Sequence, residues 1–197
     1  MHISEGILSL PVLAAGVGFA AAGTGIGLKK LDPDRIPKTG ILAAAFFVAS
    51  LIHVPVGPSS VHLILNGIVG LILGWAAFPA ILVALVLQAV FFQYGGITTL
   101  GANTVLMALP AVICYYAFHP LIHKRPAVAL PAAFACGMLA VMLSGLLLGG
   151  FLVFTGQHFL EISVMVIAAH IPVMIIEGII TMFCIGFLKK VQPALLQ

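Results

Sequence analysis

The sequence predicts an all-α integral membrane protein, a bundle of about seven transmembrane helices. Of its 197 residues, 62% are hydrophobic and only 7% are charged, whereas soluble domains average about 25% charged residues. The apolar stretches are continuous rather than alternating, which favours helices over barrel strands, the two backbone structures that a bilayer permits. These observations exclude a soluble globular domain and a disordered chain.

Seven apolar stretches suit helical spans, because a hydrocarbon core about 30 Å thick needs roughly 20 helical residues. We expect the spans at residues 8–28, 39–56, 61–77, 78–94, 103–122, 127–154 and 162–188. Only the stretch from Trp75 to Pro79 marks a turn between the third and fourth spans, and residues 54–60 are a candidate re-entrant segment. Residues 1–197 then form a single membrane-embedded domain.

The basic residues fall on one side of these spans, which predicts the orientation. They follow the first, fifth and seventh spans: Lys29, Lys30, Arg35, Lys38, Lys124, Arg125, Lys189 and Lys190. Positive charge collects on the cytoplasmic side, so we expect the N-terminus outside and the C-terminus in the cytoplasm. Short basic groups beside apolar stretches form no nucleic-acid-binding face, and the surroundings are membrane lipid.

The first two residues can form a metal chelator on the outer side. We expect Met1 to be the mature terminus, so that its amine, the His2 main-chain nitrogen and His2 Nδ1 can close two fused rings around one ion. His62, at the start of the third span on the same membrane face, can add a fourth nitrogen. Four nitrogens in a plane suit Ni(II) or Cu(II). The alternative is that His2 is an ordinary exposed terminal residue.

Four segments carry a family resemblance: MHISEG at the N-terminus, HVPVGPSSVHLILNG at 53–67, QAVFFQYGGITTLGAN at 88–103 and AHIPVMIIEG at 169–178. In this order they resemble the CbiM/NikM family, the substrate-specific membrane components of energy-coupling factor (ECF) ABC transporters for cobalt or nickel. The resemblance implies that Met1, His2 and His62 hold the metal and that a metal-binding segment, residues 1–7, tucks into the bundle. The family often has Pro and Asp where this chain has Ser4 and Glu5, which weakens any choice between cobalt and nickel.

Four other polar residues are candidates for a second shell around the ligands. His53 either orients a ligand or caps a helix end, and Asn103 either steadies the Gly-rich outer loop 93–103 or caps a helix. His170 and Glu177 share one face of the last span, where an intramembrane carboxylate is a functional candidate by default. For these two, a hydrogen-bonded structural pair is the favoured alternative.

A stripe of small residues on the first span, Ala14, Gly18 and Ala22, lets another helix approach closely. The resemblance implies that this stripe faces a transmembrane coupling subunit (CbiQ/NikQ-like), while packing within the chain is an equal alternative. The resemblance also implies ATPase subunits (CbiO/NikO-like) and, as a further candidate, a small accessory membrane subunit (CbiN-like). GTGIGLKK at 23–30 lacks the ending of a phosphate loop, so ATP hydrolysis is expected on partner chains.

We therefore expect a transporter subunit of a bacterial or archaeal cell membrane rather than an enzyme. Its transported substrate is Co(II) or Ni(II), with cobalamin biosynthesis as one destination of cobalt, and it needs no catalytic cofactor. One alternative is a stand-alone divalent metal permease. Another is a metal-dependent membrane enzyme, which needs an open coordination position and a nearby base. His119 and His123 are expected on the cytoplasmic surface, and His158 in a loop.

Overall fold

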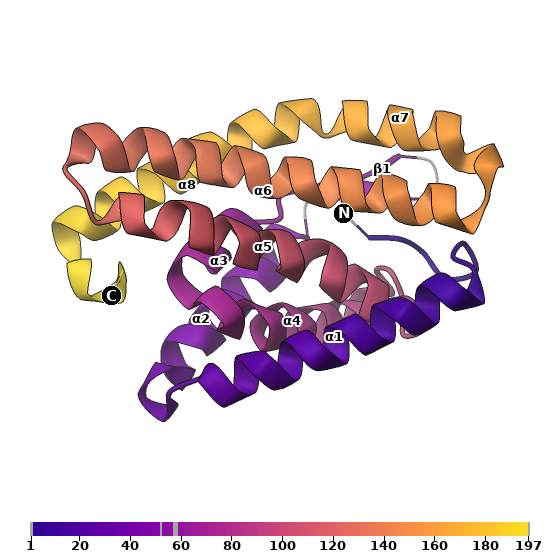
Figure 1. The fold of residues 1–197 in the computed structure, drawn as a ribbon, viewed down its shortest axis with the longest axis horizontal. Coiled ribbons are helices and arrows are strands. Elements are labelled where there is room, and N and C mark those ends of the chain that lie inside the picture. Colours follow the sequence, from indigo (N-terminus) through magenta and orange to yellow (C-terminus); the bar gives the residue numbers. More distant parts are fainter. Residues whose placement is uncertain (1, 52, 57–58, 197) are drawn as a thin grey trace.

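The computed structural model describes residues 2–51, 53–56 and 59–196, and these form a helical bundle (Figure 1). The helices are α1 (Leu10–Lys30), α2 (Ile36–Ala49), α3 (Asn66–Leu73), α4 (Ala77–Phe92), α5 (Leu100–Ile122), α6 (Pro126–Thr155), α7 (Leu160–Ala169) and α8 (Ile171–Val191). Short 3-10 turns are η1 (Pro33–Arg35), η2 (Gly74–Ala76), η3 (Gln157–Phe159) and η4 (Pro193–Leu196). Strands β1 (His53–Val56) and β2 (Ser59–His62) form an antiparallel hairpin.

Helix α5 lies between two groups of helices (Figure 1). Helices α1 and α4 pack against α5 on one side, and α2 packs on α4. Helix α6 packs against α5 on the other side and is covered by α7 and α8. The short helix α3 contacts both α5 and α6, so the residues that precede it lie in the interior.

Prolines and glycines explain how these helices begin and pack. Proline occupies the first turn of α1, α2, α6 and α8, where the missing N–H would have no partner in the helix. Glycine allows α1 and α5 to cross closely: a Cβ on Gly16 would lie 2.8 Å from the main chain of Ala102. In the same way, a Cβ on Gly67 of α3 would lie 2.7 Å from Gly137 Cα of α6.

Within the described residues, five helical segments are long and apolar enough to cross a membrane: Leu10–Lys30, Asn66–Phe92, Leu100–Ile122, Pro126–Thr155 and Gln157–Val191. The predicted first, fifth, sixth and seventh spans correspond to four of them. The remaining segment, Asn66–Phe92, joins the predicted third and fourth spans. The predicted turn between those two spans is confirmed, because η2 lies there and Gly74 has a positive φ of 55°.

The predicted bounds of the second and third helices are wrong. Helix α2 ends at Ala49 after 14 residues, and α3 has only 8 residues, which gives lengths of about 21 Å and 12 Å. The residues between them include the β-hairpin, at the stretch singled out as re-entrant. Pro55 explains the change, because proline has no N–H to donate and holds the preceding residue in an extended conformation. His62 therefore ends a strand instead of beginning a helix.

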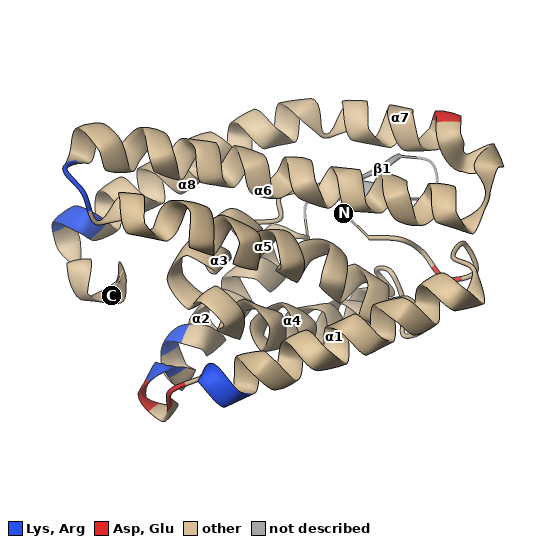
Figure 2. Cartoon of the chain, viewed as in Figure 1, with Lys and Arg blue, Asp and Glu red and all other residues tan. Residues whose placement is uncertain are grey.

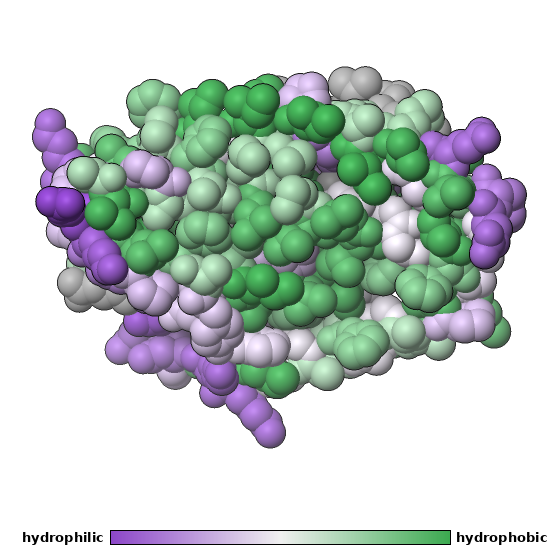
Figure 3. Space-filling model, turned by 45° about the horizontal axis from the view of Figure 1, so that its top comes forward, coloured by the Kyte–Doolittle hydropathy of each residue, from purple (hydrophilic) through white to green (hydrophobic). Residues whose placement is uncertain are grey.

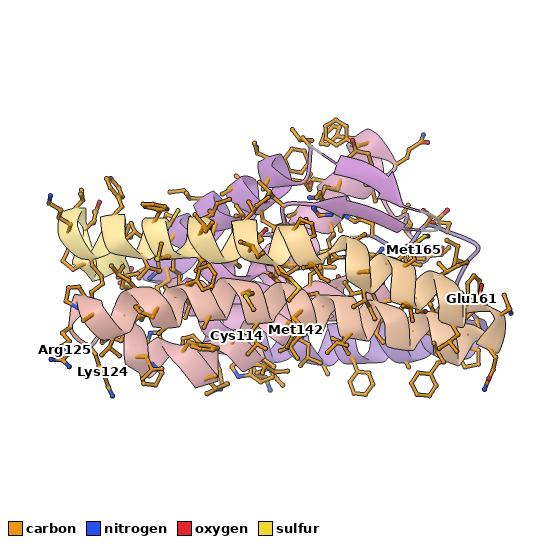
Figure 4. The ribbon with its side chains drawn as sticks, turned by 90° about the horizontal axis from the view of Figure 1, so that it is seen from above. Cys114, Lys124, Arg125, Met142, Glu161 and Met165 are labelled. Carbon is orange, nitrogen blue, oxygen red and sulfur yellow. The ribbon has the colours of Figure 1, made fainter. Side chains whose placement is uncertain are left out.

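The surface has a broad hydrophobic belt between two hydrophilic ends (Figure 3). Large apolar side chains such as Leu10, Phe154 and Phe183 are 78%, 83% and 67% exposed. Lys and Arg gather at one end of the bundle (Figure 2), and Figure 4 shows Lys124 and Arg125 at the end opposite to Glu161. An apolar belt of this kind is the surface that a bilayer solvates.

Candidate metal-capture site

Of the N-terminal segment, residues 2–8, His2, Ile3 and Leu8 are buried, whereas residues 4–6 are exposed. The segment lies beyond the end of α1 that is opposite to the basic residues. Ile3 is fully buried, and the Asn103 side chain binds its main chain on both sides. Ile3 N donates to Asn103 Oδ1 at 2.9 Å, and Asn103 Nδ2 donates to Ile3 O at 3.1 Å. Further along, Glu5 N donates to Gly95 O at 3.1 Å. An amide side chain thus satisfies the buried main chain as a neighbouring strand would.

His2 and His62 meet in the interior, where each is 3% exposed. His2 Nδ1 and His62 Nε2 are 3.1 Å apart. The other nitrogen of each ring faces an oxygen: His2 Nε2 lies 2.7 Å from Gln88 Oε1, and His62 Nδ1 lies 2.7 Å from Leu63 O. Because these oxygens can only accept, they assign the ring protons to His2 Nε2 and His62 Nδ1. His2 Nδ1 and His62 Nε2 then present lone pairs toward each other.

This arrangement suits a shared cation. Two lone pairs at 3.1 Å repel each other, whereas adjacent donors at right angles around one ion, with bonds of about 2.0 to 2.1 Å, lie about 2.9 Å apart. A ligating histidine commonly donates its second N–H to an oxygen, as both rings do here. The predicted ligand Met1 lies outside the described residues. Within the described ranges, no group of three or more His, Cys, Asp or Glu residues could hold a metal.

The loop between α4 and α5 covers the N-terminal segment. Glu5 Oε1 accepts hydrogen bonds from Thr98 N at 2.9 Å and from Thr98 Oγ1 at 3.1 Å, and these bonds lower the pKa of Glu5 below its ordinary value. Gly95 and Gly96 both have positive φ, and a Cβ on Gly96 would lie 2.1 Å from Glu5 Cγ. The loop is therefore glycine-rich because its main chain lies directly against this segment.

Asn103 lies in the first turn of α5, next to the close crossing with α1. Its Nδ2 also donates to Thr99 Oγ1 at 3.2 Å, and it is 2% exposed. The bond to Thr99 reaches the outer loop 93–103, and the two bonds to Ile3 reach the N-terminal segment. Asn103 links the helix to the terminal segment through Ile3.

The remaining second-shell candidates lie around His62. His53 pairs with His62 across the hairpin, and its side chain is outside the described part of the structure. His170 ends α7 and is 1% exposed, and its Nδ1 donates to Val166 O at 2.6 Å. Glu177 of α8 accepts hydrogen bonds from Ile64 N and Leu65 N. His170 and Glu177 therefore do not form the hydrogen-bonded pair that their spacing favoured.

Other predicted residues lie away from the site. His119 and His123 lie at the basic end of α5, with their Nε2 atoms 3.3 Å apart, and His158 lies in the turn η3.

The predicted stripe on α1 is exposed. Ala14, Gly18 and Ala22 all face outward, and a Cβ on Gly18 would meet no atom within 4 Å. A second set of small residues packs α1 inside the chain: Gly16, Ala20, Gly23 and Gly27. The first stripe is therefore available to a neighbour in the membrane.

Gln88 is the site residue that sequence reasoning missed. It is fully buried on α4, and its oxygen sets the proton position of His2. The feature of the sequence that could have identified Gln88 is a polar side chain within an otherwise apolar span. Burial of such a side chain costs free energy unless it has a hydrogen-bond partner.

The apolar belt and the buried imidazole pair define a multi-pass helical membrane protein with a candidate site for a transition-metal ion. Residues 2–195 match the family CbiM, described as the cobalt uptake substrate-specific transmembrane region. The chain belongs to this family. A crystal structure of a transition metal transporter is similar, with 25% identity, a TM-score of 0.78 and coverage of 97% of this chain and 93% of that chain.

Relatives in bacteria and archaea include proteins named for metal transport. One from Haemophilus influenzae is 45% identical over 98% of this chain and 95% of its own length. A fused nickel transport protein, NikMN, of Rhodobacter capsulatus is 44% identical over 55% of this chain and 33% of its own length. A fused cobalt transport protein, CbiMQ, of Methanocorpusculum labreanum is 27% identical over 98% of this chain and 36% of its own length. The chain thus spans about a third of the length of each of these two fused proteins.

Proposed function

We propose that this chain captures Co(II) or Ni(II) as the substrate-specific subunit of an ECF-type ABC importer. The observation that carries the proposal is the pair of buried imidazoles, whose unprotonated nitrogens face each other at 3.1 Å. A buried pair of this kind suits a cation that binds both rings. The family description and the names of the relatives agree with cobalt or nickel as the substrate.

Four nitrogens hold the ion in this proposal. The Met1 amine, the His2 main-chain nitrogen and His2 Nδ1 form a five-membered and a six-membered ring with the metal, and His62 Nε2 completes the plane. A planar set of nitrogens suits Ni(II) among first-row ions. Binding displaces protons from the amine and the amide, so metal affinity rises with pH.

The contacts around the N-terminal segment support its role in capture. Asn103 binds the main chain one residue after His2, and Gln88 binds the His2 ring itself. Glu5 closes the outer loop over the segment through Thr98. These bonds hold the donor atoms in one arrangement before the ion arrives, which reduces the entropy lost on binding.

The proposed topology has seven crossings, with the N-terminus outside and the C-terminus in the cytoplasm. The crossings are α1, α2, the hairpin with α3, α4, α5, α6, and α7 with α8. The collection of basic residues at one end (Figure 2) supports this orientation. The capture site then opens toward the outside, as an importer requires.

Partner subunits supply the energy in this proposal. The names of the fused relatives, CbiMQ and NikMN, agree with a coupling subunit and a small accessory subunit, and ATPase subunits complete the importer. The exposed stripe Ala14, Gly18 and Ala22 is the surface that we assign to the coupling subunit, because small residues let membrane helices approach closely.

Substitution of the second histidine tests the proposal. In purified protein with an unmodified N-terminus, His62→Ala should retain much less Co(II) or Ni(II), because one of four donors is lost and about 1.4 kcal/mol already means a tenfold change in affinity. His119→Ala, at the opposite end of the bundle, is the matched control and should bind like the wild type. Equal metal content in the two variants, measured after equilibrium dialysis, contradicts the proposed ligands.

A further inference from the structure

The two imidazoles of the site are positioned by different sets of hydrogen bonds. The His2 ring bonds to Gln88 of α4, and the residue after His2 bonds to Asn103 of α5. The described contacts of the His62 side chain include no hydrogen bond to α4 or α5. Its ring contacts Leu63 O and His2 Nδ1. The chain that follows His62 is bound at Ile64 and Leu65 by Glu177 of α8. Asn66, the next residue, donates from Nδ2 to Met107 O of α5 at 3.2 Å and to Ser144 Oγ of α6 at 2.9 Å.

Among the described residues, the hydrogen-bond donors to the Glu177 side chain lie just after His62 in the sequence. The side chain is fully buried, and Oε1 accepts hydrogen bonds from Ile64 N and, at 2.8 Å, from Leu65 N. The second oxygen, Oε2, has no hydrogen-bond partner among the described residues. The two main-chain amides also lie at the N-terminal end of α3, where a negative charge is favoured by the helix dipole. The carboxylate is therefore aimed at the short segment that joins His62 to α3.

That segment adopts a backbone conformation that needs support. Leu65 has a φ of 57°, which is unfavourable for a residue with a side chain. Leu63 O, in the same segment, accepts the hydrogen bond from His62 Nδ1 and so directs His62 Nε2 toward His2. The position of the His62 donor atom thus depends on the backbone that Glu177 binds.

We propose that Glu177 is a positioning residue, which holds segment 62–65 so that His62 Nε2 reaches the ion bound by the N-terminal segment. The ion is then held between His2, whose ring is bound by Gln88 of α4, and His62, whose position is set through Glu177 of α8. This inference rests on the proposed capture of Co(II) or Ni(II). It goes further by assigning the geometry of the second histidine to a carboxylate 115 residues away in the sequence.

The test measures Ni(II) binding to the purified full chain with an unmodified N-terminus and a C-terminal tag. Glu177→Ala should weaken binding by about 10–100-fold, the range found for residues that orient metal ligands. Its visible absorption spectrum should match that of His62→Ala, because both lose the same nitrogen from the plane. Glu177→Gln should keep an affinity near that of the wild type, since its carbonyl oxygen can still accept both N–H groups.

Thr181→Val is the matched control, because Thr181 lies one helical turn further along α8 and is also fully buried. It should leave both the affinity and the spectrum unchanged. The decisive comparison is a double-mutant cycle. If Glu177 acts through His62, Glu177→Ala should cause no further loss in the His62→Ala background, whereas a general structural defect lowers affinity in both backgrounds.

Three results overturn the inference while leaving metal capture intact: wild-type affinity and spectrum in Glu177→Ala, additive losses in the cycle, or an equal loss in Glu177→Gln. If Glu177→Ala does not fold, Glu177→Asp, whose carboxylate is one methylene shorter, replaces it in the cycle. Failure of the proposed function gives a different result, in which the wild type and His62→Ala bind Ni(II) equally or not at all.

Discussion

His2 and His62 each use one ring nitrogen to donate a hydrogen bond to an oxygen, and in the proposed site the other nitrogen of each ring binds the metal. The acceptors are an amide oxygen, Gln88 Oε1, and a main-chain oxygen, Leu63 O. Which nitrogen of a neutral imidazole binds a metal is set by the partner of its other nitrogen. At the scale of single residues, the capture site therefore depends on two oxygens as much as on its nitrogens.

Substitution of Gln88 tests this dependence. Gln88→Leu has a similar volume but removes the acceptor, so His2 Nε2–H loses its partner and the Nδ1 lone pair is no longer held toward His62. We expect metal affinity to fall by about 10–100-fold, measured by equilibrium dialysis. Gln88→Glu, which still accepts at the same position, should bind at least as tightly as the wild type. Equal binding by Gln88→Leu and the wild type would mean that the acceptor plays no part in capture.

An extension of the N-terminus should abolish binding. One or two residues before Met1 convert its amine into a peptide nitrogen and move the new amine away by about 3.3 to 3.6 Å per residue, so the fused rings cannot form although His2 remains. A tag after Gln197 should be harmless. The measurement is the metal content of the two purified proteins at equal thermal stability. Equal content would show that the amine is not a ligand.

The sequence predicts part of this site for a clear physical reason. Met1 and His2 are adjacent in the sequence, so the proposed chelate is local and can be predicted from two residues. The role of Gln88 cannot be predicted in this way, because its bond to His2 joins residues 86 positions apart. The bond from Ile3 to Asn103 spans 100 positions. Contacts of this kind depend on how the helices pack.

At the scale of helices, the crossing of α1 and α5 places Asn103. Gly16 lies against the main chain of Ala102, and Gly101 lies against the main chain of Val17. Both contacts are within two residues of Asn103, so a change in the spacing of the two helices moves the side chain that binds Ile3. The crossing thus connects the packing of the bundle to the position of the N-terminal segment.

Two glycines on α1 form a matched pair for testing this connection. Gly16→Leu should destabilise the protein by about 1–3 kcal/mol, as expected for overpacking, and weaken metal retention, because the new side chain would separate α1 from α5. Gly18→Leu should leave the isolated protein unchanged, since a Cβ there meets no atom within 4 Å. Thermal unfolding in detergent and metal content provide the measurements. Equal behaviour of the two variants would contradict the role of the crossing.

The hairpin shows where helix prediction from this sequence fails. Residues 53–62 contain no Lys, Arg, Asp or Glu and lie between apolar stretches, so composition alone extends the neighbouring helices through them. Proline and the exchange of main-chain hydrogen bonds between β1 and β2 decide the outcome instead. The turn before α4 was predictable, because Gly74 and the aromatic and proline residues after it interrupt an otherwise helical pattern.

At the scale of the whole molecule, charge distinguishes the two ends. Lys189 Nζ donates to Ile122 O and Lys124 O, and Lys38 Nζ donates to Leu195 O at 3.2 Å. These bonds connect the basic ends of helices that are distant in the sequence. The N-terminal segment and Glu5 belong to the other end, so the proposed orientation applies to the bundle as a unit.

Cysteine labelling tests the orientation. In a chain whose three cysteines are replaced by alanine, Ile97→Cys should react with an impermeant thiol reagent added to intact cells, because Ile97 is 74% exposed beside the outer loop glycines. Lys30→Cys, at the basic end, should react only after the cells are opened. Labelling in the reverse pattern would place the N-terminus in the cytoplasm and reject an outward-facing capture site.

The burial of the N-terminal segment also determines the order in which the molecule can fold. Residues 2–8 leave the ribosome before their partners, because Gln88 follows His2 by 86 positions and Asn103 follows Ile3 by 100 positions. At about 5–20 residues per second, roughly 5 to 20 s of synthesis separate the segment from its partners. Closing such a long loop costs chain entropy before any contact repays it. The segment therefore cannot nucleate folding, and it docks late, into a bundle whose helices have already assembled.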